Sequence, residues 1–234
     1  MEMGFESRLA KRISSRRDTK RGWKTYASFV GVIFIVITLT SSTLAVPQAT
    51  VHTGTKTSVA KYLGQFDCGS NVLMLGALTP SDWICIKVPF KGRLSDLQSI
   101  SFSEFVSQTG GVQAEPFVVL KLQRGMFLVC HPELSYVTGE WSLPYFSWQS
   151  RDTVANGKWN MAPVSESTDL NTLQFWTGAL GNVEVIMISI FVGMWELTSP
   201  YQCYLGDYAI NGKLIDLANS KRTSSGGWDL PAGF

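Results

Sequence analysis

Positive charge is scarce beyond the first 45 residues of this sequence. The chain has 234 residues, 16% of them charged, and a formal net charge of +2. Residues 1–45 hold eight of the 20 Lys and Arg residues but three of the 18 Asp and Glu residues, which leaves 12 basic and 15 acidic residues downstream. Binding to nucleic acid needs a basic surface that neutralises phosphates. The downstream region lacks such an excess, so we expect no nucleic-acid partner.

The sequence also lacks the short motifs of common enzymes. It contains no HExxH, no GxSxG, no glycine-rich phosphate loop and no EF-hand loop. Carboxylates paired at short spacing are missing as well, although a polysaccharide-cleaving enzyme needs two of them about 5–10 Å apart. Distant segments could still bring two carboxylates together in a cleft. We therefore predict a protein that is not an enzyme and has no cofactor, unless it binds Ca²⁺.

An uncharged apolar run follows the basic residues. Residues 27–39 carry no charge, and residues 27–46 reach the length of about 20 residues that a helix needs to cross a bilayer. The positive charges before the run predict a cytoplasmic segment over residues 1–24, a transmembrane anchor over residues 25–46 and export of the rest. The same pattern fits a signal peptide cleaved after Thr43-Leu44-Ala45, which would make the protein secreted. The membrane is the expected partner of this leader.

All four cysteines lie beyond the apolar run, on the side expected to be oxidising. They are Cys68, Cys85, Cys130 and Cys203. An even number of cysteines in an exported domain is typical of disulfides, and four cysteines allow three connectivities. We expect Cys68–Cys85 and Cys130–Cys203, because the first pair brackets a short segment. Zinc is disfavoured, since there is no CxxC pair and the spacings match no zinc motif. Free buried thiols are the third alternative.

Composition divides the exported part into three regions. Residues 47–61 are rich in Thr and Ser without an apolar period, which predicts a stalk. Residues 62–218 carry strand patterns, of which residues 83–90 alternate most regularly between apolar and polar positions. Residues 219–234 are rich in Gly and Ser, which predicts a flexible tail. The central region is therefore the expected folded domain.

Turn residues and one helical pattern define the expected fold class. Gln123-Arg124-Gly125 and Asn211-Gly212 each separate two strand patterns and predict hairpins. Candidate N-caps at residues 167–169 precede leucines at helical spacing, and Gly181 is the expected end of this single short helix. Residues 183–194 form a β-branched run typical of a buried strand. These patterns predict a mainly β protein, an antiparallel β-sandwich of the jelly-roll type.

Aromatic residues gather in one turn-rich stretch of the domain. Exposed rings can stack on the apolar faces of sugars, and neighbouring polar groups can bond to sugar hydroxyls. The same rings could instead fill the core between two sheets, which is the more common role. The candidate ligand-binding residues are Trp141, Tyr145, Trp148, Arg151, Asp152 and Trp159.

Asp207 is the candidate metal ligand. It lies in a strand pattern over residues 204–210, and Glu184 and Asp216 stand on neighbouring predicted elements. Carboxylates near the edge of a sandwich can hold Ca²⁺ through their oxygens. The pattern includes no clustered calcium-binding motif, so Ca²⁺ is a hypothesis for this one residue.

Three segments of the sequence carry residue patterns that also occur in known domains. Residues 92–102 read G-x-L-x-D-L-x-x-I-S-F, residues 116–122 form an apolar strand pattern, and residues 206–212 read G-D-x-x-I-N-G. They resemble the strand entry, the following strand and the closing strand of exported concanavalin-like or jelly-roll domains, over roughly residues 83–217. The resemblance implies a carbohydrate-binding-like sandwich in which the aspartate of the closing strand, here Asp207, is structural or linked to calcium.

The sequence thus predicts a membrane-anchored or secreted protein whose extracytoplasmic jelly roll binds a ligand, a glycan or a surface protein. Two alternatives stay open: a structural component of a cell surface or virion, and a polysaccharide-degrading jelly-roll enzyme. A groove lined by the aromatic candidates would favour binding. Burial of these rings, with a large flat apolar patch elsewhere, would favour assembly.

Overall fold

Strands dominate the part of the chain that the computed structural model describes, which is residues 48–55, 57–66, 69–77, 79, 81–109, 116–130, 146–162, 170–181, 183–193 and 200–224. The strands are β1 (Gln48–Thr53), β2 (Val59–Phe66), β3 (Gly69–Ala77), β4 (Trp83–Arg93), β5 (Ile100–Thr109), β6 (Phe117–Leu122), β7 (Phe127–Cys130), β8 (Gln149–Asp152), β9 (Trp159–Ala162), β10 (Glu184–Gly193), β11 (Tyr201–Ile210), β12 (Lys213–Leu214) and β13 (Asp216–Ser224). The short helices are η3 (Leu94–Asp96), η4 (Gln123–Gly125), α3 (Thr153–Asn156) and α4 (Leu173–Leu180).

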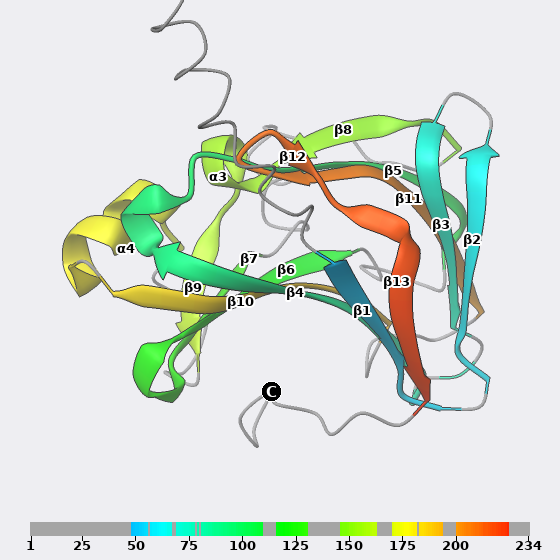
Figure 1. Ribbon diagram of the computed structural model, residues 1–234, viewed down its shortest axis with the longest axis horizontal. Coiled ribbons are helices and arrows are strands. Elements are labelled where there is room, and N and C mark those ends of the chain that lie inside the picture. Colours follow the sequence, from blue (N-terminus) through cyan, green and yellow to red (C-terminus); the bar gives the residue numbers. More distant parts are fainter. Residues whose placement is uncertain are drawn as a thin grey trace, which may run out of the picture. The chain divides into compact units, whose positions relative to one another are not determined.

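In these ranges the strands form two facing sheets (Figure 1). The seven-stranded sheet has the order β13-β1-β4-β10-β6-β7-β9. The six-stranded sheet has the order β2-β3-β11-β5-β8, with β12 beside β11. The chain passes repeatedly from one sheet to the other, so neighbours such as β3, β11 and β5 come from distant parts of the sequence. The predicted β-sandwich is confirmed.

One pair of strands departs from the predicted antiparallel arrangement. β1 and β13 run parallel, with Val51 beside Arg222 and His52 beside Thr223. The seven-stranded sheet is therefore mixed. The pairing joins two ends of the domain that are far apart in sequence, and local patterning says nothing about such a contact.

The strands at both ends extend the domain beyond its predicted limits. β1 lies inside the expected stalk of residues 47–61, where it pairs with β4, and its Ala49 and Val51 are buried. Only these two positions face the core, and Thr50 between them suits a strand because threonine is β-branched. β13 runs to Ser224, inside the expected tail of residues 219–234. The stalk and tail predictions are wrong over these two strands.

The predicted leader of residues 1–46 lies outside the described residues, as does the end of the tail after Ser224. Within the described ranges, none of the helices has the length and apolar character to cross a membrane.

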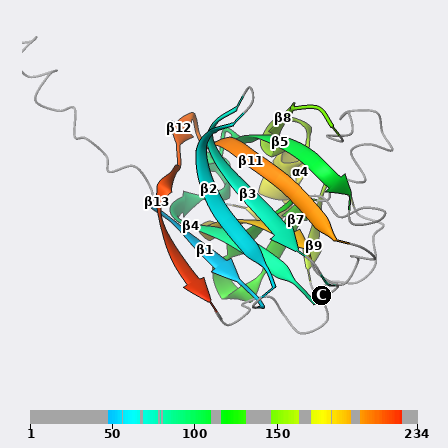
Figure 2. The same cartoon turned by 90° about the vertical axis from the view of Figure 1, so that its right-hand side faces the viewer.

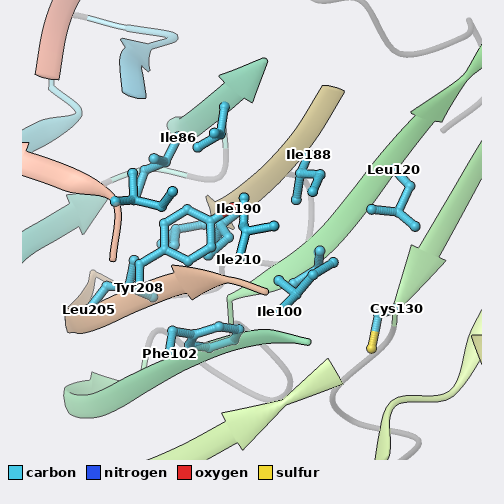
Figure 3. Packing of buried hydrophobic residues seen from close by; sticks show 14 of the residues in the cluster. Ile86, Ile100, Phe102, Leu120, Cys130, Ile188, Ile190, Leu205, Tyr208 and Ile210 are labelled. Atoms are coloured by element: carbon cyan, nitrogen blue, oxygen red, sulfur yellow. The ribbon is translucent and has the colours of Figure 1, made fainter. Parts of the chain in front are cut away.

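The hydrophobic core lies between the inner faces of the two sheets (Figure 3). Inward residues alternate with outward ones along each strand, as in β4, where Ile84, Ile86 and Val88 are buried. Each fully buried aliphatic side chain contributes about 1.5–3 kcal/mol relative to an exposed one. The labelled core residues are Ile86, Leu120, Cys130, Ile188 and Ile190 from the seven-stranded sheet and Ile100, Phe102, Leu205, Tyr208 and Ile210 from the other.

Both predicted hairpins are present. Asn211 and Gly212 have φ angles of 50° and 72°, and they join β11 to β12 with Ile210 opposite Lys213. Two successive positive φ angles match the type I′ turn that favours Asn-Gly. In the other hairpin, Arg124 and Gly125 have φ angles of 64° and 73° between β6 and β7.

The predicted helix is α4, at one end of the sandwich (left in Figure 1). It ends at Gly181, whose φ is 67°, as the sequence predicted. Its N-cap is Thr172, whose hydroxyl accepts a hydrogen bond from the Phe175 amide at 3.3 Å. The N-caps expected at residues 167–169 lie outside the described residues. A second helix, α3, forms one turn that the sequence did not predict.

The predicted disulfides are not formed by the described cysteines. Cys85, Cys130 and Cys203 are buried thiols, and Cys68 lies outside the described residues. Cys85 lies among apolar side chains on the outer face of the seven-stranded sheet. Cys130 and Cys203 face the core from opposite sheets, and neither of them forms a disulfide. The predicted Cys130–Cys203 bridge is therefore wrong.

Candidate functional site

Four aromatic side chains form a row on the six-stranded sheet. Figure 2 shows the strands of this sheet, with β2, β3, β11 and β5 side by side. The row consists of Phe66 on β2, Tyr204 on β11, Phe105 on β5 and Trp148 just before β8. The ring centroids of Phe66 and Tyr204 are 4.3 Å apart and stacked. Those of Tyr204 and Phe105 are 5.9 Å apart, and those of Phe105 and Trp148 are 5.7 Å apart. We call these four residues the aromatic row.

Strand periodicity and register place the aromatic row on the outer face. Ile100, Phe102 and Val106 of β5 face the core, so Phe105 points to the other side of the sheet. Tyr204 is the direct partner of Phe105. Side chains of direct partners share one face at about 4.5–5.5 Å between Cβ atoms. The row therefore depends on β11 pairing with β5 in this register.

The rings of the aromatic row are partly accessible to solvent. Phe66, Phe105 and Trp148 are half-buried, and Tyr204 is 9% exposed. Half-buried rings packed against one another form a firm apolar strip that keeps part of its surface in water. A ligand could cover that remaining surface without unfolding any element.

Hydroxyl and amide groups lie beside the aromatic row. The Gln202 side-chain amide donates to the Tyr204 hydroxyl, and the Ser107 hydroxyl donates to the Gln202 carbonyl at 3.4 Å. Gly206 pairs with Ser103, and a Cβ at Gly206 would come within 3.1 Å of the Ser103 hydroxyl. Neighbouring groups therefore fill the space around Gly206, which leaves little room for a side chain there. Rings bordered by neutral polar groups suit a ligand with apolar faces and a hydroxyl rim.

The aromatic candidates predicted from the sequence do not form one cluster in the described part of the structure. Trp148 belongs to the aromatic row, and Trp141 and Tyr145 lie outside the described residues. Trp159 has no exposed surface, and its indole N–H donates to the Thr153 carbonyl at 2.8 Å. A ring that is enclosed on all sides cannot stack on a ligand. The prediction of Trp159 as a ligand-binding residue is therefore corrected: it is a core residue.

Arg151 and Asp152 have structural partners. The Arg151 Nε donates to the Glu104 Oε1 at 2.5 Å, with both side chains almost fully buried. Asp152 is the N-cap of α3, and its Oδ1 accepts from the Val154 and Ala155 amides at 3.1 and 3.3 Å. Arg151 faces the interior and is not positioned to contact a ligand. The two residues hold β8 and α3 in place, directly after Trp148.

Glu104 is an unusual carboxylate because it lies beneath the aromatic row. Burial raises its pKa to about 7, and the charge of Arg151 and its hydrogen bond offset part of this effect. Its second oxygen, Oε2, is buried without a hydrogen-bond partner. Protonation of Glu104 near neutral pH is therefore favourable in the folded protein.

We expect the contribution of Glu104 to the free energy of unfolding to increase as the pH falls through neutrality. The folded pKa lies above the ordinary value of 4.5, so this contribution is fully present below pH 4.5 and is lost as the pH rises through about 7. The difference amounts to roughly 3 kcal/mol at most. Urea unfolding at pH 5 and pH 8 measures it.

Glu104→Gln is the matched control for this pH dependence. Other carboxylates act in the opposite direction, such as Asp216, whose pKa is lowered by hydrogen bonds from Asn219. The comparison with the variant cancels their effect. The change in unfolding free energy between pH 5 and 8 should differ between the two proteins. Equal changes would contradict the assignment to Glu104.

Asp207 lacks the surroundings expected of a calcium ligand. Its carboxylate accepts a hydrogen bond from the Ser70 hydroxyl at 2.6 Å, and its φ is 49° at an irregularity of β11. Glu184 lies in the other sheet and accepts from Gln123, while Asp216 begins β13. In the described ranges, no group of three or more His, Cys, Asp or Glu residues could hold a metal ion. The structure places no second carboxylate ligand beside Asp207 among these residues.

The outer face of the seven-stranded sheet carries a small pocket. Its volume of about 20 Å³ holds roughly one water molecule. A sugar ring does not fit, so this pocket does not compete with the aromatic row as a glycan site. Its lining residues are Lys87, Val119, Lys121, Phe127, Met187, Ser189 and Phe191.

Sequence reasoning missed three of the four residues of the aromatic row. Phe66, Phe105 and Tyr204 lie on three different strands, far from one another in the sequence and from the aromatic-rich stretch. The alternation along residues 100–106 does place Phe105 opposite the core residues. That signal identifies an outward ring, but the identity of its neighbours depends on the strand order.

No family model matches this sequence, and no curated protein matches it. The fold is similar to a family 11 carbohydrate-binding module from Clostridium thermocellum, solved in complex with a β-1,3-1,4-mixed-linked tetrasaccharide. The sequences of this chain and the module are 13% identical, and the TM-score is 0.41. The match covers 74% of this chain and 93% of the module. The family 11 module of the cellulosomal cellulase Lic26A-Cel5E of the same organism is 12% identical, with a TM-score of 0.38 over 71% and 91%.

A β-1,2-glucanase from Parabacteroides distasonis is also similar. It is 12% identical with a TM-score of 0.41, and the match covers 70% of this chain but 22% of the glucanase. TM-scores below 0.5 transfer no function, so any function has to be argued from the residues of the aromatic row.

Proposed function

We propose that this protein binds a glycan through the aromatic row on the outer face of the six-stranded sheet, and that it is a binding protein and not an enzyme. The observation that carries the proposal is the unbroken contact of three half-buried rings and the mostly buried ring of Tyr204, with centroid distances of 4.3 to 5.9 Å. Aromatic rings present large apolar faces at low conformational cost. The apolar face of a sugar ring can stack on them.

The direction of the aromatic row supports a chain-like ligand. The row runs across the strands, and neighbouring strands lie about 4.8 Å apart. A glycan lying in the same direction meets rings from β11, β5 and the segment before β8 in turn, and it reaches the ring on β2 after passing β3, which contributes none. Several weak stacking contacts then add up along one chain. A single sugar unit would use one or two of them.

The polar neighbours of the row supply hydrogen bonds of neutral character. Gln202 has an amide and Ser107 a hydroxyl beside Tyr204, and both types of group pair with sugar hydroxyls. Their neutrality favours an uncharged glycan over an acidic one. A cluster of arginines or lysines would instead be expected for carboxylated or sulfated sugars.

The proposed setting is the non-cytoplasmic side of a membrane, with the chain anchored or secreted. It is supported by the sequence, in which eight basic residues precede the apolar run of residues 27–39. In this setting the domain is a jelly-roll sandwich that presents the aromatic row to extracellular glycans.

Binding of uncharged glycans to the full chain, purified in detergent, tests the proposal. We expect Phe105→Ala and Trp148→Ala each to weaken binding of a neutral oligosaccharide at least tenfold on a glycan array and in titration calorimetry, because each removes a ring from the row. Tenfold corresponds to about 1.4 kcal/mol.

Phe175→Ala is the matched control, since this phenylalanine is 51% exposed on α4 and outside the row. It should bind as the wild type does. Near-UV circular dichroism confirms that the variants are folded. A folded wild-type protein that binds no neutral glycan, or row variants that bind normally, would refute the proposal. Self-association through the sheet face would then favour the structural alternative.

A further inference from the structure

Phe146 is the most exposed of the large hydrophobic side chains in the described ranges. It is 70% exposed, while the next, Phe175, is 51% exposed. Leaving an aromatic ring in water forgoes much of the roughly 1.5–3 kcal/mol that its burial would contribute. Packing against the described residues therefore does not account for a phenylalanine at this position.

The backbone of Phe146 is also strained. Its φ is 57°, in the left-handed region. A non-glycine residue loses roughly 1–2 kcal/mol in this region, and for a bulky side chain such a conformation is rare. Strain of this kind persists where the surroundings fix it, and it is concentrated at functional sites.

A hydrogen bond fixes this strained residue at one end of the aromatic row. The Phe146 amide donates to the Val106 carbonyl at 2.9 Å, so its backbone lies beside β5. Val106 directly follows Phe105, and Trp148 stands two residues after Phe146. The ring of Trp148 in turn contacts that of Phe105. The turn before β8 thus brings an exposed ring to the Trp148 end of the row.

We propose that Phe146 is a fifth ligand-contacting ring, which extends the glycan site beyond Trp148. This inference rests on the proposed glycan binding by the aromatic row. Because Phe146 lies beyond the end of the row, it contributes to binding only when the oligosaccharide is long enough to reach it. A short oligosaccharide that covers part of the row does not reach Phe146, whereas a longer one gains an additional stacking contact. Phe146 therefore selects for chain length.

The Phe146→Gly variant separates ligand contact from folding. Glycine adopts a positive φ without strain and exposes no ring, so the melting temperature should stay equal or rise. The affinity for a long neutral oligosaccharide, measured by calorimetry on the full chain in detergent, should fall at least fivefold. The affinity for the shortest oligosaccharide that the wild type binds should stay unchanged. This selective loss, together with unreduced stability, is the expected result.

Phe105→Ala and Phe175→Ala, measured beside it, make the outcomes distinguishable. If Phe105→Ala weakens binding and Phe146→Gly binds long chains as the wild type does, the role of Phe146 is refuted and the row keeps its function. A lower melting temperature of Phe146→Gly would also overturn the inference, because it would assign Phe146 to folding. If the folded wild type binds no glycan, the proposed function itself fails, and the role of Phe146 fails with it.

Discussion

Arg151→Leu should lower the free energy of unfolding by about 3–5 kcal/mol near pH 8, since the buried carboxyl group must then either lose its cation or be protonated far above its ordinary pKa. Arg151 and Glu104 lie 4% and 1% exposed between the sheets, joined by a 2.5 Å contact. The loss should be smaller at pH 5. Without Arg151 nothing offsets the burial that raises the pKa of Glu104, so the carboxyl group is protonated and neutral there. Urea unfolding at both pH values measures the two losses.

The double variant Glu104→Leu/Arg151→Leu is the control for this experiment. Replacing both members of a buried ion pair with apolar residues is often neutral or stabilising, in contrast to removing one. The Glu104 Oε2 has no hydrogen-bond partner, so the pair is incompletely satisfied. We expect the double variant to regain most of the stability that Arg151→Leu loses. A loss below about 1 kcal/mol in the single variant would contradict the buried-pair interpretation.

Trp159→Ala should destabilise the fold by about 3–5 kcal/mol, the range observed when a buried large aromatic residue is truncated. The Trp159 ring has no exposed surface, and its N–H donates to the Thr153 carbonyl at 2.8 Å. Its own carbonyl accepts from the Trp176 indole at 2.9 Å. The residue therefore joins β9 to α3 and α4, and its removal leaves a cavity at their junction. The midpoint of urea unfolding reports the loss.

Trp148→Ala is the comparison for Trp159→Ala. The two tryptophans are 11 residues apart, but Trp148 is half-buried in the aromatic row and fills no enclosed space. We expect it to lose clearly less stability than Trp159→Ala while losing glycan binding. Similar stability losses in the two variants would show that Trp148 is also a core residue, which would remove a member of the row.

The sequence by itself determined the local elements. Alternation over residues 83–90 predicted β4, the β-branched run after residue 183 predicted β10, and Asn211-Gly212 predicted the turn after β11. Helical spacing ended by Gly181 predicted α4. These signals are carried by neighbouring residues, because backbone dihedral angles and the side-chain period depend on residues a few positions apart. Many strand patterns together with a single helical pattern were sufficient to predict a β-sandwich.

Tertiary structure alone decided which residues share a face with which. Trp148 and Trp159 belong to the same aromatic stretch, but the turn of α3 lies between them and sends one to the surface and the other into the core. The parallel pairing of β1 with β13 turned an expected stalk into a strand. Tertiary structure also placed Cys130 and Cys203 in opposite sheets, where neither forms a disulfide.

The candidate site was likewise determined by the tertiary structure and not by local sequence patterns. The aromatic row joins residues 66, 105, 148 and 204, which meet because β11 lies between β3 and β5 and because β8 follows β5 at the sheet edge. The buried pair of Glu104 and Arg151 follows from the same strand order, since β5 and β8 put the two residues on one inner face. Local patterns fix the outward or inward direction of a side chain. The order and register of strands, which depend on the packing of the whole core, fix its neighbours.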